Sequence, residues 1–555
     1  MKKTFIAVAL IATQALQAQI LYVNNADDTY QAIDTKETKE VTFDEEQQLV
    51  KFSLQDGTIS SFATKGVESI SLSASKKNAL TYSLNPTVTF DTADSGNYNE
   101  VTEAIPEDEL HDDYGDYVEK YTVSRVVTIT FSENSVKVGS AAGLEGFSYT
   151  TDGAHIVINS ERSNMAYRVK GTSSNGSLKI YSLKKFLLMA SGVNLTNPTG
   201  PAINIQSGKT VYFTISNGTT NSLCDGSTYN SPVIGADGTE EDQKGTLFSE
   251  GQLIFDGSGT LNVTSLGGHA ICSDDYIRVR SGNINIVEAA KDGFRTKDKF
   301  IVTRTAAAAP TITINATNNG IDCSEGTLTI EAGKLEITSG SEAIKVEYED
   351  SVPDPAVIPD VYIKGGYIKI ATTGEKSSAI KVTRDYIQSG GIIQAEVKGN
   401  GSKIVNCDNN TTFSGGKLTG FATGSVSSDS TSAGGIKCNG NITITDGTIA
   451  IECSGRGSKG FNCNGTITID GGSTTLLSLA GNYTDIADDK KSRAITTGTI
   501  TVNGGKLVAL AYDNAISATG IEIGDGSINA YSTTTTALNI EAAQSGGWLL
   551  TKDAE

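Results

Sequence analysis

A recurring interval of about two dozen residues constrains the fold of this chain more than any other feature. Phe248, Ile271 and Phe294 follow one another at intervals of 23 residues. Short alternating apolar segments fill each interval, and glycine-containing turns separate them without any helical periodicity. A fixed period in this range predicts a solenoid of stacked β coils.

The apolar anchor of each interval recurs from Ile203 to Leu538, usually after glycine or alanine. From Phe248 onward most intervals lie between 21 and 27 residues, and three are longer. A coil of this length accommodates three short strands and three turns. We therefore predict an all-β chain whose residues 121–545 form a right-handed parallel β-helix of roughly a dozen three-strand coils. The later anchors are Ile321, Ile344, Ile380, Ile404, Ile436, Phe461, Ile495 and Ile516.

The segments around the solenoid differ from it in composition. Residues 1–18 join two lysines to a short apolar run that ends in small residues, which predicts a secretory signal peptide. Residues 19–80 contain short apolar segments between polar turns and are expected to form a small β domain. Residues 81–120 are an acidic linker, solvated by default, with a cation-binding loop as the alternative. The β domain could shield one end of the solenoid, and the tail or cap of residues 546–555 the other.

Charge and targeting limit the partners of the chain. The formal net charge of −20 argues against nucleic acid, because phosphate binding needs a basic surface. After the signal peptide no apolar run is long enough to span a bilayer. We expect an exported protein, either secreted or at the cell surface, with the periplasm as the alternative.

The cysteines are sparse for a disulfide framework. Cys323, Cys438 and Cys463 each follow an anchor by two residues, so we expect them to face inward and to contribute to a buried ladder. A disulfide between Cys438 and Cys463 is the alternative if their coils are neighbours, but neighbouring parallel strands in register offer poor disulfide geometry. We expect reduced, structural thiols.

Four insertions interrupt the period, at residues 221–245, 347–360, 421–435 and 482–493. The last three flank anchors and are expected to emerge from one corner, where they would border a groove suited to binding. The predicted ligand-binding residues at or near the first insertion are Asp225, Tyr229, Asp242 and Glu250, together with His269 in the next coil.

Acidic residues recur at fixed offsets from the anchors. His269, Asp292 and Asn319 stand two places before successive anchors, and acids stand four places after them. Coils stack about 4.8 Å apart, so carboxylates in one column repel unless a cation lies between them. Calcium takes six to eight oxygen ligands and suits this pattern, although solvated turn acids are the alternative. The predicted calcium ligands are Asp274, Asp275, Asp292, Asp298, Asn319, Asp322 and Glu325.

Tyr276, Arg278 and Arg280 are expected to point outward beside these acids, because Ile277 and Val279 alternate with them. The arginines could pair with the acids, or they could bind a ligand carboxylate through two parallel hydrogen bonds. Calcium together with arginine would make a net-acidic surface locally attractive to an acidic polysaccharide.

Several stretches carry a resemblance to a known bacterial family. The chain resembles secreted, calcium-binding, carbohydrate-binding β-helix proteins that are related in fold to pectate lyases. The resemblance extends over roughly residues 120–545. It implies binding of an acidic plant cell-wall polysaccharide such as polygalacturonate, without clear catalytic activity. The stretches that carry it are YSLKKFLLMASGVNL, GPAINIQSGKTVYFTI, KGTLFSEGQLIFDGSGTLNV, HAICSDDYIRVRSGNI and AKDGF.

The leading hypothesis is therefore a secreted, non-catalytic protein that binds uronate-containing polysaccharide through calcium on one face of a β-helix. The first alternative is a polysaccharide lyase on the same scaffold, in which Arg278 or Arg280 would remove a proton. Arginine is a poor base, which disfavours this alternative. The second alternative is a surface adhesin or structural rod without a glycan ligand.

Overall fold

The computed structural model describes residues 20–25, 29–34, 36–44, 48–63, 67–71, 78–79, 86–97, 114–235, 238–348, 355–485, 489–540, 542–545 and 548–552. The predicted signal peptide, residues 81–85 and 98–113 of the linker and the last three residues lie outside this range. No helix in the described part of the chain is long and apolar enough to cross a membrane.

The predicted all-β fold with a parallel β-helix is confirmed. Two compact units are present: unit 1 comprises Met1–Phe90 and Lys398–Glu555, and unit 2 comprises Asp91–Val397. In both units successive coils contribute one strand to each of three faces, and each strand pairs in parallel with its equivalent one coil later.

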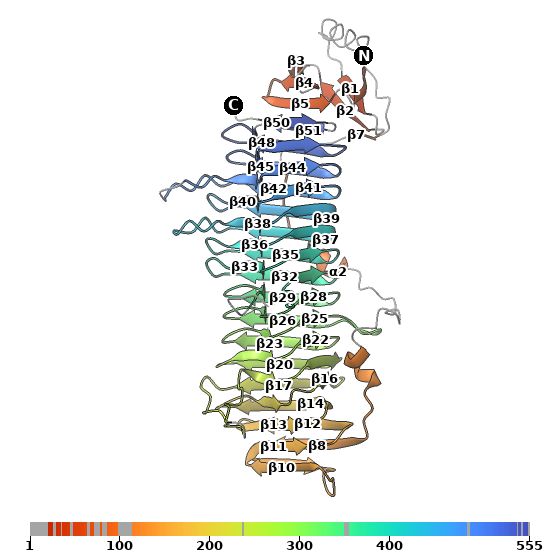
Figure 1. Ribbon diagram of the computed structural model, residues 1–555, viewed down its shortest axis with the longest axis vertical. Helices are drawn as coiled ribbons and strands as arrows, with labels where there is room; N and C mark the ends of the chain where they lie inside the picture. The colour runs from red at the N-terminus through yellow and green to blue at the C-terminus, as the bar shows by residue number, and fades with distance from the viewer. Residues whose placement is uncertain are drawn as a thin grey trace. The chain divides into compact units, whose positions relative to one another are not determined.

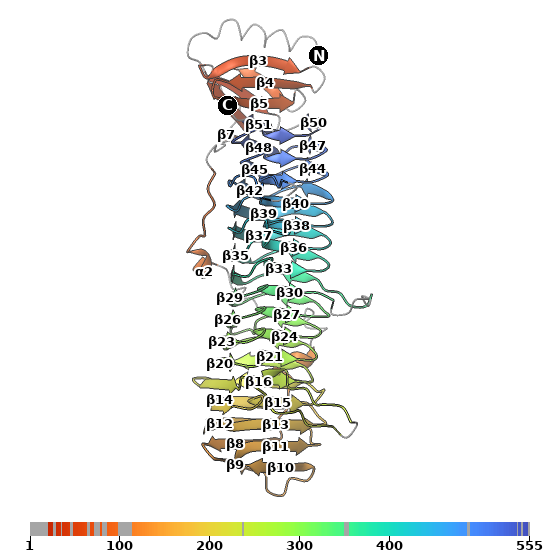
Figure 2. The same ribbon diagram turned by 90° about the vertical axis from the view of Figure 1, so that its left-hand side faces the viewer.

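One coil of unit 2 shows the pattern. β21 lies on the first face, β22 on the second and β23 on the third, and they pair in register with β24, β25 and β26 of the next coil. Figure 2 shows the stacked first-face strands β21, β24, β27 and β30, and Figure 1 shows the second and third faces side by side. Isoleucine, valine, leucine and phenylalanine fill the interior because every second strand residue points inward.

The strands of unit 2 are grouped by face. The first face consists of β11 (Ala154–Ser160), β13 (Gly176–Ser182), β15 (Ile203–Gln206), β18 (Gly245–Ser249), β21 (His269–Ser273), β24 (Phe294–Thr296), β27 (Ile321–Cys323), β30 (Ile344–Val346) and β33 (Ser378–Val382). The second face consists of β16 (Val211–Ile215), β19 (Leu253–Gly257), β22 (Ile277–Val279), β25 (Phe300–Val302), β28 (Leu328–Ile330), β31 (Val361–Ile363) and β34 (Tyr386–Gln388). The third face consists of β17 (Thr220–Asp225), β20 (Thr260–Ser265), β23 (Asn283–Ala289), β26 (Thr311–Ala316), β29 (Lys334–Ser339), β32 (Tyr367–Thr372) and β35 (Ile392–Val397). β14 (Phe186–Asn197) spans the second and third faces, and β12 (Met165–Ser173) and β8 (Arg125–Ser132) stack parallel to it.

The strands of unit 1 follow the same plan. Its first face consists of β36 (Lys403–Cys407), β38 (Gly434–Cys438), β40 (Lys459–Cys463), β43 (Arg493–Thr496), β46 (Ile516–Ser517) and β49 (Leu538–Asn539). Its second face contains β41 (Thr466–Ile469), β44 (Thr499–Val502), β47 (Gly520–Ile523) and β50 (Ala542–Ser545), and its third face contains β42 (Ser473–Ser478), β45 (Lys506–Ala511), β48 (Ser527–Ser532) and β51 (Trp548–Lys552). β37 (Thr411–Ala422) and β39 (Ile442–Cys453) span the second and third faces.

The predicted register is correct for most coils and wrong by one residue in two. Phe294, Ile321, Ile344 and Ile380 align as expected. The partner of Ile271 is Leu247, however, and Phe248 pairs with Cys272 on the opposite side of the strand. In unit 1 the partner of Ile436 is likewise Val405 and not Ile404. In each case two apolar residues are adjacent in the sequence, and the prediction took the wrong one as the anchor. Periodicity alone does not discriminate between such neighbours.

The corrected register of unit 1 explains its thiol ladder. Cys407, Cys438 and Cys463 are buried in register on β36, β38 and β40. The prediction missed Cys407 because it follows Val405, the true anchor, by two residues. Cys323 belongs to unit 2, where Thr296 and Val346 are its partners. All seven cysteines are free, as expected.

Antiparallel pairing is present beside the parallel coils of each unit. In unit 2, β9 (Ser135–Gly139) pairs antiparallel with β8, and β10 (Phe147–Asp152) pairs antiparallel with β11. In unit 1, β5 (Thr58–Ala63) of the small N-terminal β domain pairs antiparallel with β51, the strand at the C-terminal end. The expectation that these two segments shield opposite ends was therefore wrong, because they pair with each other.

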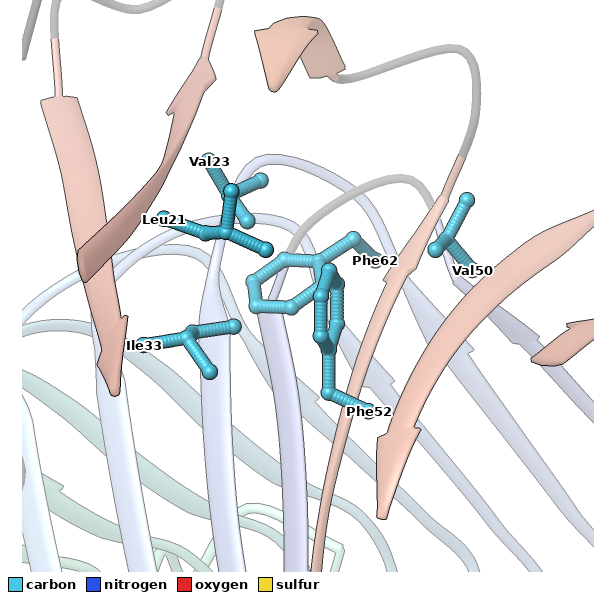
Figure 3. Packing of buried hydrophobic residues seen from close by; sticks show 6 residues of the cluster. All are labelled: Leu21, Val23, Ile33, Val50, Phe52 and Phe62. Atoms are coloured by element: carbon cyan, nitrogen blue, oxygen red, sulfur yellow. The ribbon is translucent and has the colours of Figure 1, made fainter. Parts of the chain in front are cut away.

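The N-terminal β domain has its own core. Its remaining strands are β1 (Ile20–Asn25), β2 (Thr29–Asp34), β3 (Thr38–Asp44), β4 (Leu49–Leu54), β6 (Val67–Ser71) and β7 (Asn78–Ala79). Figure 3 shows the cluster of Leu21, Val23, Ile33, Val50, Phe52 and Phe62 that these strands bury. The rings of Phe52 and Phe62 meet edge to face at 5.7 Å, a favourable aromatic geometry.

The insertions do not share one corner. The loops 226–244, 423–433 and 479–492 each lead from the third face to the first, whereas the loop 347–360 leads from the first face to the second. The loop 226–244 is the insertion that reaches the candidate site described below.

Candidate functional site

Three carboxylates converge on the outer side of the first face of unit 2. Glu250 and Asp274 follow β18 and β21 directly, at equivalent positions one coil apart. The loop 226–244 supplies Asp242. One carboxylate oxygen from each residue lies within 4.8 Å of the others, the only such grouping of three acidic, histidine or cysteine side chains in the described part of the chain. We call these three residues the acidic cluster.

The outer face of β13 and β15 holds this loop in place. Lys179 Nζ lies 2.8 Å from Glu241 Oε2, and the Tyr181 hydroxyl donates to Glu241 Oε1 at 2.6 Å. Gln206 Nε2 donates to the backbone carbonyl of Asp242 at 2.9 Å. Contacts with two earlier coils therefore hold Asp242 in place.

Asp225 and Tyr229, which were predicted to bind a ligand, fasten the start of the same loop. Asp225 is buried and accepts hydrogen bonds from the Tyr229 hydroxyl at 2.5 Å and from Ser265 Oγ at 2.7 Å. It also accepts the backbone N–H of Leu266. These contacts satisfy the carboxylate inside the protein, so both residues have a structural role in the arrangement seen here.

A lysine ammonium occupies the middle of the acidic cluster. Lys244 Nζ lies 2.8 Å from Asp242 Oδ2 and 2.6 Å from Asp274 Oδ2. Burial opposes its charge, yet the hydrogen bonds to Asp242 and Asp274 outweigh burial and raise the pKa of Lys244. One monovalent group thus serves three carboxylates, which leaves an excess of negative charge.

The pKa values of Glu250 and Asp274 agree with an excess of negative charge in the acidic cluster. Burial, followed by the charges of Asp274 and Asp242, raises the pKa of Glu250 to about 7. Burial also raises the pKa of Asp274, against the effect of Lys244. Hard oxygen donors at short mutual distance with insufficient positive charge fit a divalent cation such as calcium.

Asp292, Asn319 and Asp322 form a second, more enclosed group in the following coils. Asp292 Oδ2 lies 3.0 Å from His269 Nδ1, and Asp292 Oδ1 accepts the backbone N–H of Asn319 at 2.9 Å. Burial alone would raise the pKa of Asp292, but the hydrogen bond from His269 lowers it. Asp322 Oδ2 pairs with Arg295 Nη1 at 2.9 Å and accepts Asn319 Nδ2 at 3.1 Å.

Two oxygen atoms of this enclosed group have no hydrogen-bond partner, namely Asn319 Oδ1 and Asp322 Oδ1. Both residues are at most 4% exposed, so each unpaired oxygen carries a desolvation cost. This group has two cationic neighbours, Arg295 and Lys345, whereas the acidic cluster has Lys244. It is therefore the weaker of the two candidate cation sites.

The remaining predicted calcium ligands lie apart from the acidic cluster. Asp275 accepts the Gln252 side-chain amide, and burial followed by the charge of Asp298 raises its pKa. Asp298 itself is exposed, and Glu325 lies 3.5 Å from Lys297 Nζ. Asp274 and Asp275 are adjacent in sequence, but they belong to different groups because the chain turns between the first and second faces there.

Tyr276, Arg278 and Arg280 lie on the second face beneath a segment of the predicted linker. This segment, residues 114–121, contains the 3-10 turns η2 (Tyr114–Asp116) and η3 (Val118–Lys120), and we call it the strap. Figure 1 draws it in orange beside the second face of unit 2. Arg278 and Arg280 are 5% and 3% exposed, so the predicted ligand-binding arginines are covered.

Three described acids of the linker make specific contacts in unit 2. Asp94 and Asp116 are buried instead of solvated. Asp94 Oδ2 accepts a hydrogen bond from the Gln394 side-chain amide at 2.9 Å. Asp116 pairs with Arg278, and Glu119 pairs with Arg280. The expectation of a solvated acidic run is therefore wrong for Asp94 and Asp116, whereas Glu119 is exposed although it pairs with Arg280.

Sequence reasoning missed Lys244, Glu241 and Arg295. Lys244 ends the acidic insertion, so a lone lysine after three acids was the available signal for a counter-ion. Arg295 directly follows the anchor Phe294, at the outward position that faces Asp322 one coil later. The coil alignment places Arg295 beside Asp322, but the prediction considered only the acidic positions of that alignment.

A family model described as "Carbohydrate-binding domain-containing protein" matches residues 152–481, which is more than half of the chain. The chain belongs to this carbohydrate-binding family. The match to the carbohydrate-binding family includes the acidic cluster, the enclosed group and both arginines, whereas the strap and the N-terminal β domain precede it.

One solved structure is similar, that of the polysaccharide lyase-like protein from C. thermocellum in a gadolinium derivative. It is 20% identical, with a TM-score of 0.38, and the match covers 52% of this chain and 97% of that one. The curated proteins contain no match.

Proposed function

We propose that the chain is an exported protein that binds acidic, uronate-containing polysaccharide on the first face of unit 2 through calcium held by the acidic cluster. Membership of the carbohydrate-binding family supports the polysaccharide ligand. The convergence of Asp242, Glu250 and Asp274 within 4.8 Å carries the calcium assignment. Plant cell-wall polygalacturonate is the first ligand to test, because its regularly repeated carboxylates match a cation-based site.

The donor set fits calcium in chemistry and number. Calcium takes six to eight oxygen ligands, and three carboxylates can supply from three to six of them, with water and ligand oxygens as the remainder. Asp242, Glu250 and Asp274 would hold the ion, and Lys244 would leave its place between two of them. The bound ion would supply positive charge for uronate carboxylates at a surface that otherwise repels them.

The surroundings support binding over polysaccharide cleavage. Lys244 is the amine of the acidic cluster, and its raised pKa keeps it protonated between two carboxylates, so it is a poor general base. Arg278 and Arg280, which the lyase alternative needed, are buried in ion pairs with the strap. Lys244, Arg278 and Arg280 therefore each have a specific obstacle to proton removal.

Affinity electrophoresis in gels containing polygalacturonate tests the proposal. We expect the protein to be retarded much more strongly in calcium than in chelator, and we expect Asp242→Asn with Asp274→Asn to migrate in calcium as the wild type does in chelator. Asp298→Asn is the matched control, because this acid is exposed and outside the acidic cluster. Equal migration of wild type in calcium and chelator would contradict the proposal. Steady growth of unsaturated-product absorbance on incubation with the polymer would instead establish the lyase.

A further inference from the structure

The strap binds its face through carboxylates. Asp116 Oδ2 lies 2.9 Å from Arg278 Nε, and the Tyr276 hydroxyl donates to Asp116 Oδ1 at 2.6 Å. Arg280 donates from Nη1 and Nη2 to the two carboxylate oxygens of Glu119 at 2.8 and 2.9 Å. The second contact is the two-pronged arginine–carboxylate geometry that proteins use to recognise acidic ligands.

The receiving surface is preorganised on the β-helix. Tyr276, Arg278 and Arg280 alternate along and beside β22, so their side chains emerge on one side at intervals of about 6.8 Å. Asp256, one coil earlier, lies 2.8 Å from Arg280 Nη1 and orients it. The ring of Tyr117 in the strap lies 4.6 Å from the same guanidinium, a stacking position that a sugar ring could also take.

The strap has little apolar attachment. Among its residues 115–121 only Asp116 is buried, and η3 buries none. Among its other contacts, the Tyr212 hydroxyl donates to the Gly115 carbonyl, and the Tyr121 hydroxyl donates to the carbonyls of Met165 and Lys185. The ring of Tyr121 also lies 5.0 Å from the ring of Tyr212. A segment held mainly by charge and hydrogen bonds can be replaced by a ligand that offers the same groups, because little hydrophobic burial is lost.

We propose that Tyr276, Arg278 and Arg280 form a second, calcium-independent binding site for polysaccharide carboxylates, and that the strap occupies this site until an acidic chain displaces it. Two arginines along one strand suit a polymer with repeated carboxylates better than a single acid. The strap lies outside the matched carbohydrate-binding region and the arginines lie inside it. The inference rests on the proposed acidic ligand, but it does not depend on calcium.

Binding measured in chelator tests this site apart from the acidic cluster. We compare full-length wild type with Asp116→Asn/Glu119→Gln for binding to immobilised polygalacturonate in EDTA at low salt. Removing the strap charges should lower the dissociation constant about tenfold. The state in which the strap has left the arginines would then no longer be a minor fraction of the molecules. Adding Arg278→Gln and Arg280→Gln to this variant should abolish the gain. Unchanged affinity, or a gain that survives loss of both arginines, would overturn the proposal.

Hydrogen exchange on the wild-type protein gives a second measurement that does not depend on folding of a variant. Polygalacturonate in EDTA should accelerate exchange of the backbone amides in residues 114–121, and uncharged dextran should not. Unchanged or slower exchange with polygalacturonate would show a purely structural strap. Failure of calcium-dependent binding with retention of this acceleration would reject the calcium proposal and keep the second site.

Discussion

The acidic cluster and the strap site, which comprises the strap with Tyr276, Arg278 and Arg280, are two places in unit 2 where carboxylates gather, and they differ in charge balance. In the acidic cluster three carboxylates share Lys244, and the pKa of Glu250 rises to about 7. At the strap site Asp116 and Glu119 meet two arginines, and the hydrogen bond from Arg280 lowers the pKa of Glu119. The first place lacks positive charge, and the second supplies it in advance.

This difference indicates what each place can bind. A site with unbalanced carboxylates gains most from a cation, whereas a site with paired arginines gains most from an anion. Under the proposed function, an acidic polysaccharide would use both, through bound calcium at one face and directly at the other. The strap then acts as an internal anion that balances the arginines when no polysaccharide is present.

The largest effect is expected from removing the arginine that connects the strap to the β-helix. Arg280→Gln leaves Asp256 and Glu119 without their shared partner. The loss should cost at most about 3 kcal/mol, because Arg280 and Asp256 are mostly buried whereas Glu119 is half exposed. Urea unfolding of the calcium-free protein measures this loss of stability. Lys364→Gln is the control, because its pair with Glu331 on the same face is about half exposed and should change stability by less than about 0.5 kcal/mol. Equal effects of the two variants would mean that the ion pairs of Arg280 stabilise the fold no more than an exposed pair does.

Loss of the acidic cluster should remove the response to calcium. At a calcium concentration 100 times the dissociation constant, the wild type should gain about 2.7 kcal/mol from binding to the folded state alone. Asp242→Asn with Asp274→Asn should show no rise in melting temperature on addition of calcium. If this variant kept the full rise while Asp292→Asn lost it, the cation would belong to the enclosed group instead.

Much of this architecture could be predicted from the sequence, because a coil repeat records its own spatial neighbours. The alignment of Phe294 with Ile321 predicted the contact between coils, and the same arithmetic placed Asp292 two residues before the anchor. The prediction failed wherever a partner came from outside the repeat. Glu119 lies 161 residues before Arg280. Asp242 was a predicted ligand-binding residue, but it comes from an insertion without a coil position, so its approach to Asp274 was not predicted. The burial of Arg278 and Arg280 under the strap therefore cannot be recognised from the repeat pattern of the sequence.

The two places should respond to pH with opposite slopes in the calcium-free protein. Glu250 has a folded pKa near 7, above its ordinary 4.5, so the folded state holds its proton longer and stability falls as pH rises between these values. Glu119 has a lowered pKa, so its contribution is present above pH 4.5 and is lost as pH falls below that value. Glu250→Gln should therefore raise the melting temperature at pH 8 and leave it unchanged at pH 4.

Solvent screening at half-exposed Glu250 limits its effect to below about 1 kcal/mol. Glu119→Gln is the matched comparison: it should lower the melting temperature at pH 7 and have little effect at pH 3. If the melting temperatures of Glu250→Gln and Glu119→Gln changed with pH in the same way, the inferred difference in charge balance between the acidic cluster and the strap site would be wrong.

The smallest effect is expected at Lys244, and it tests whether this residue competes with calcium. Lys244→Met keeps an aliphatic side chain and removes the ammonium, which lies between Asp242 and Asp274 and 5.8 Å from the centroid of the Phe248 ring. The calcium-free protein should lose up to about 1 kcal/mol, because the ion pairs are partly exposed. Calcium affinity should rise about threefold to fivefold, since the ion no longer displaces a bound charge.

Isothermal titration of calcium into both proteins measures this change, with Lys297→Met as the control on the same face. Lys297 pairs only loosely, at 3.5 Å, with Glu325, which lies outside the acidic cluster, so its loss should leave the affinity unchanged. A weaker calcium affinity in Lys244→Met would mean that the ammonium organises the carboxylates for the ion. In that case Lys244 would be a positioning residue, and the charge deficit inferred from Glu250 would not be the property that attracts calcium.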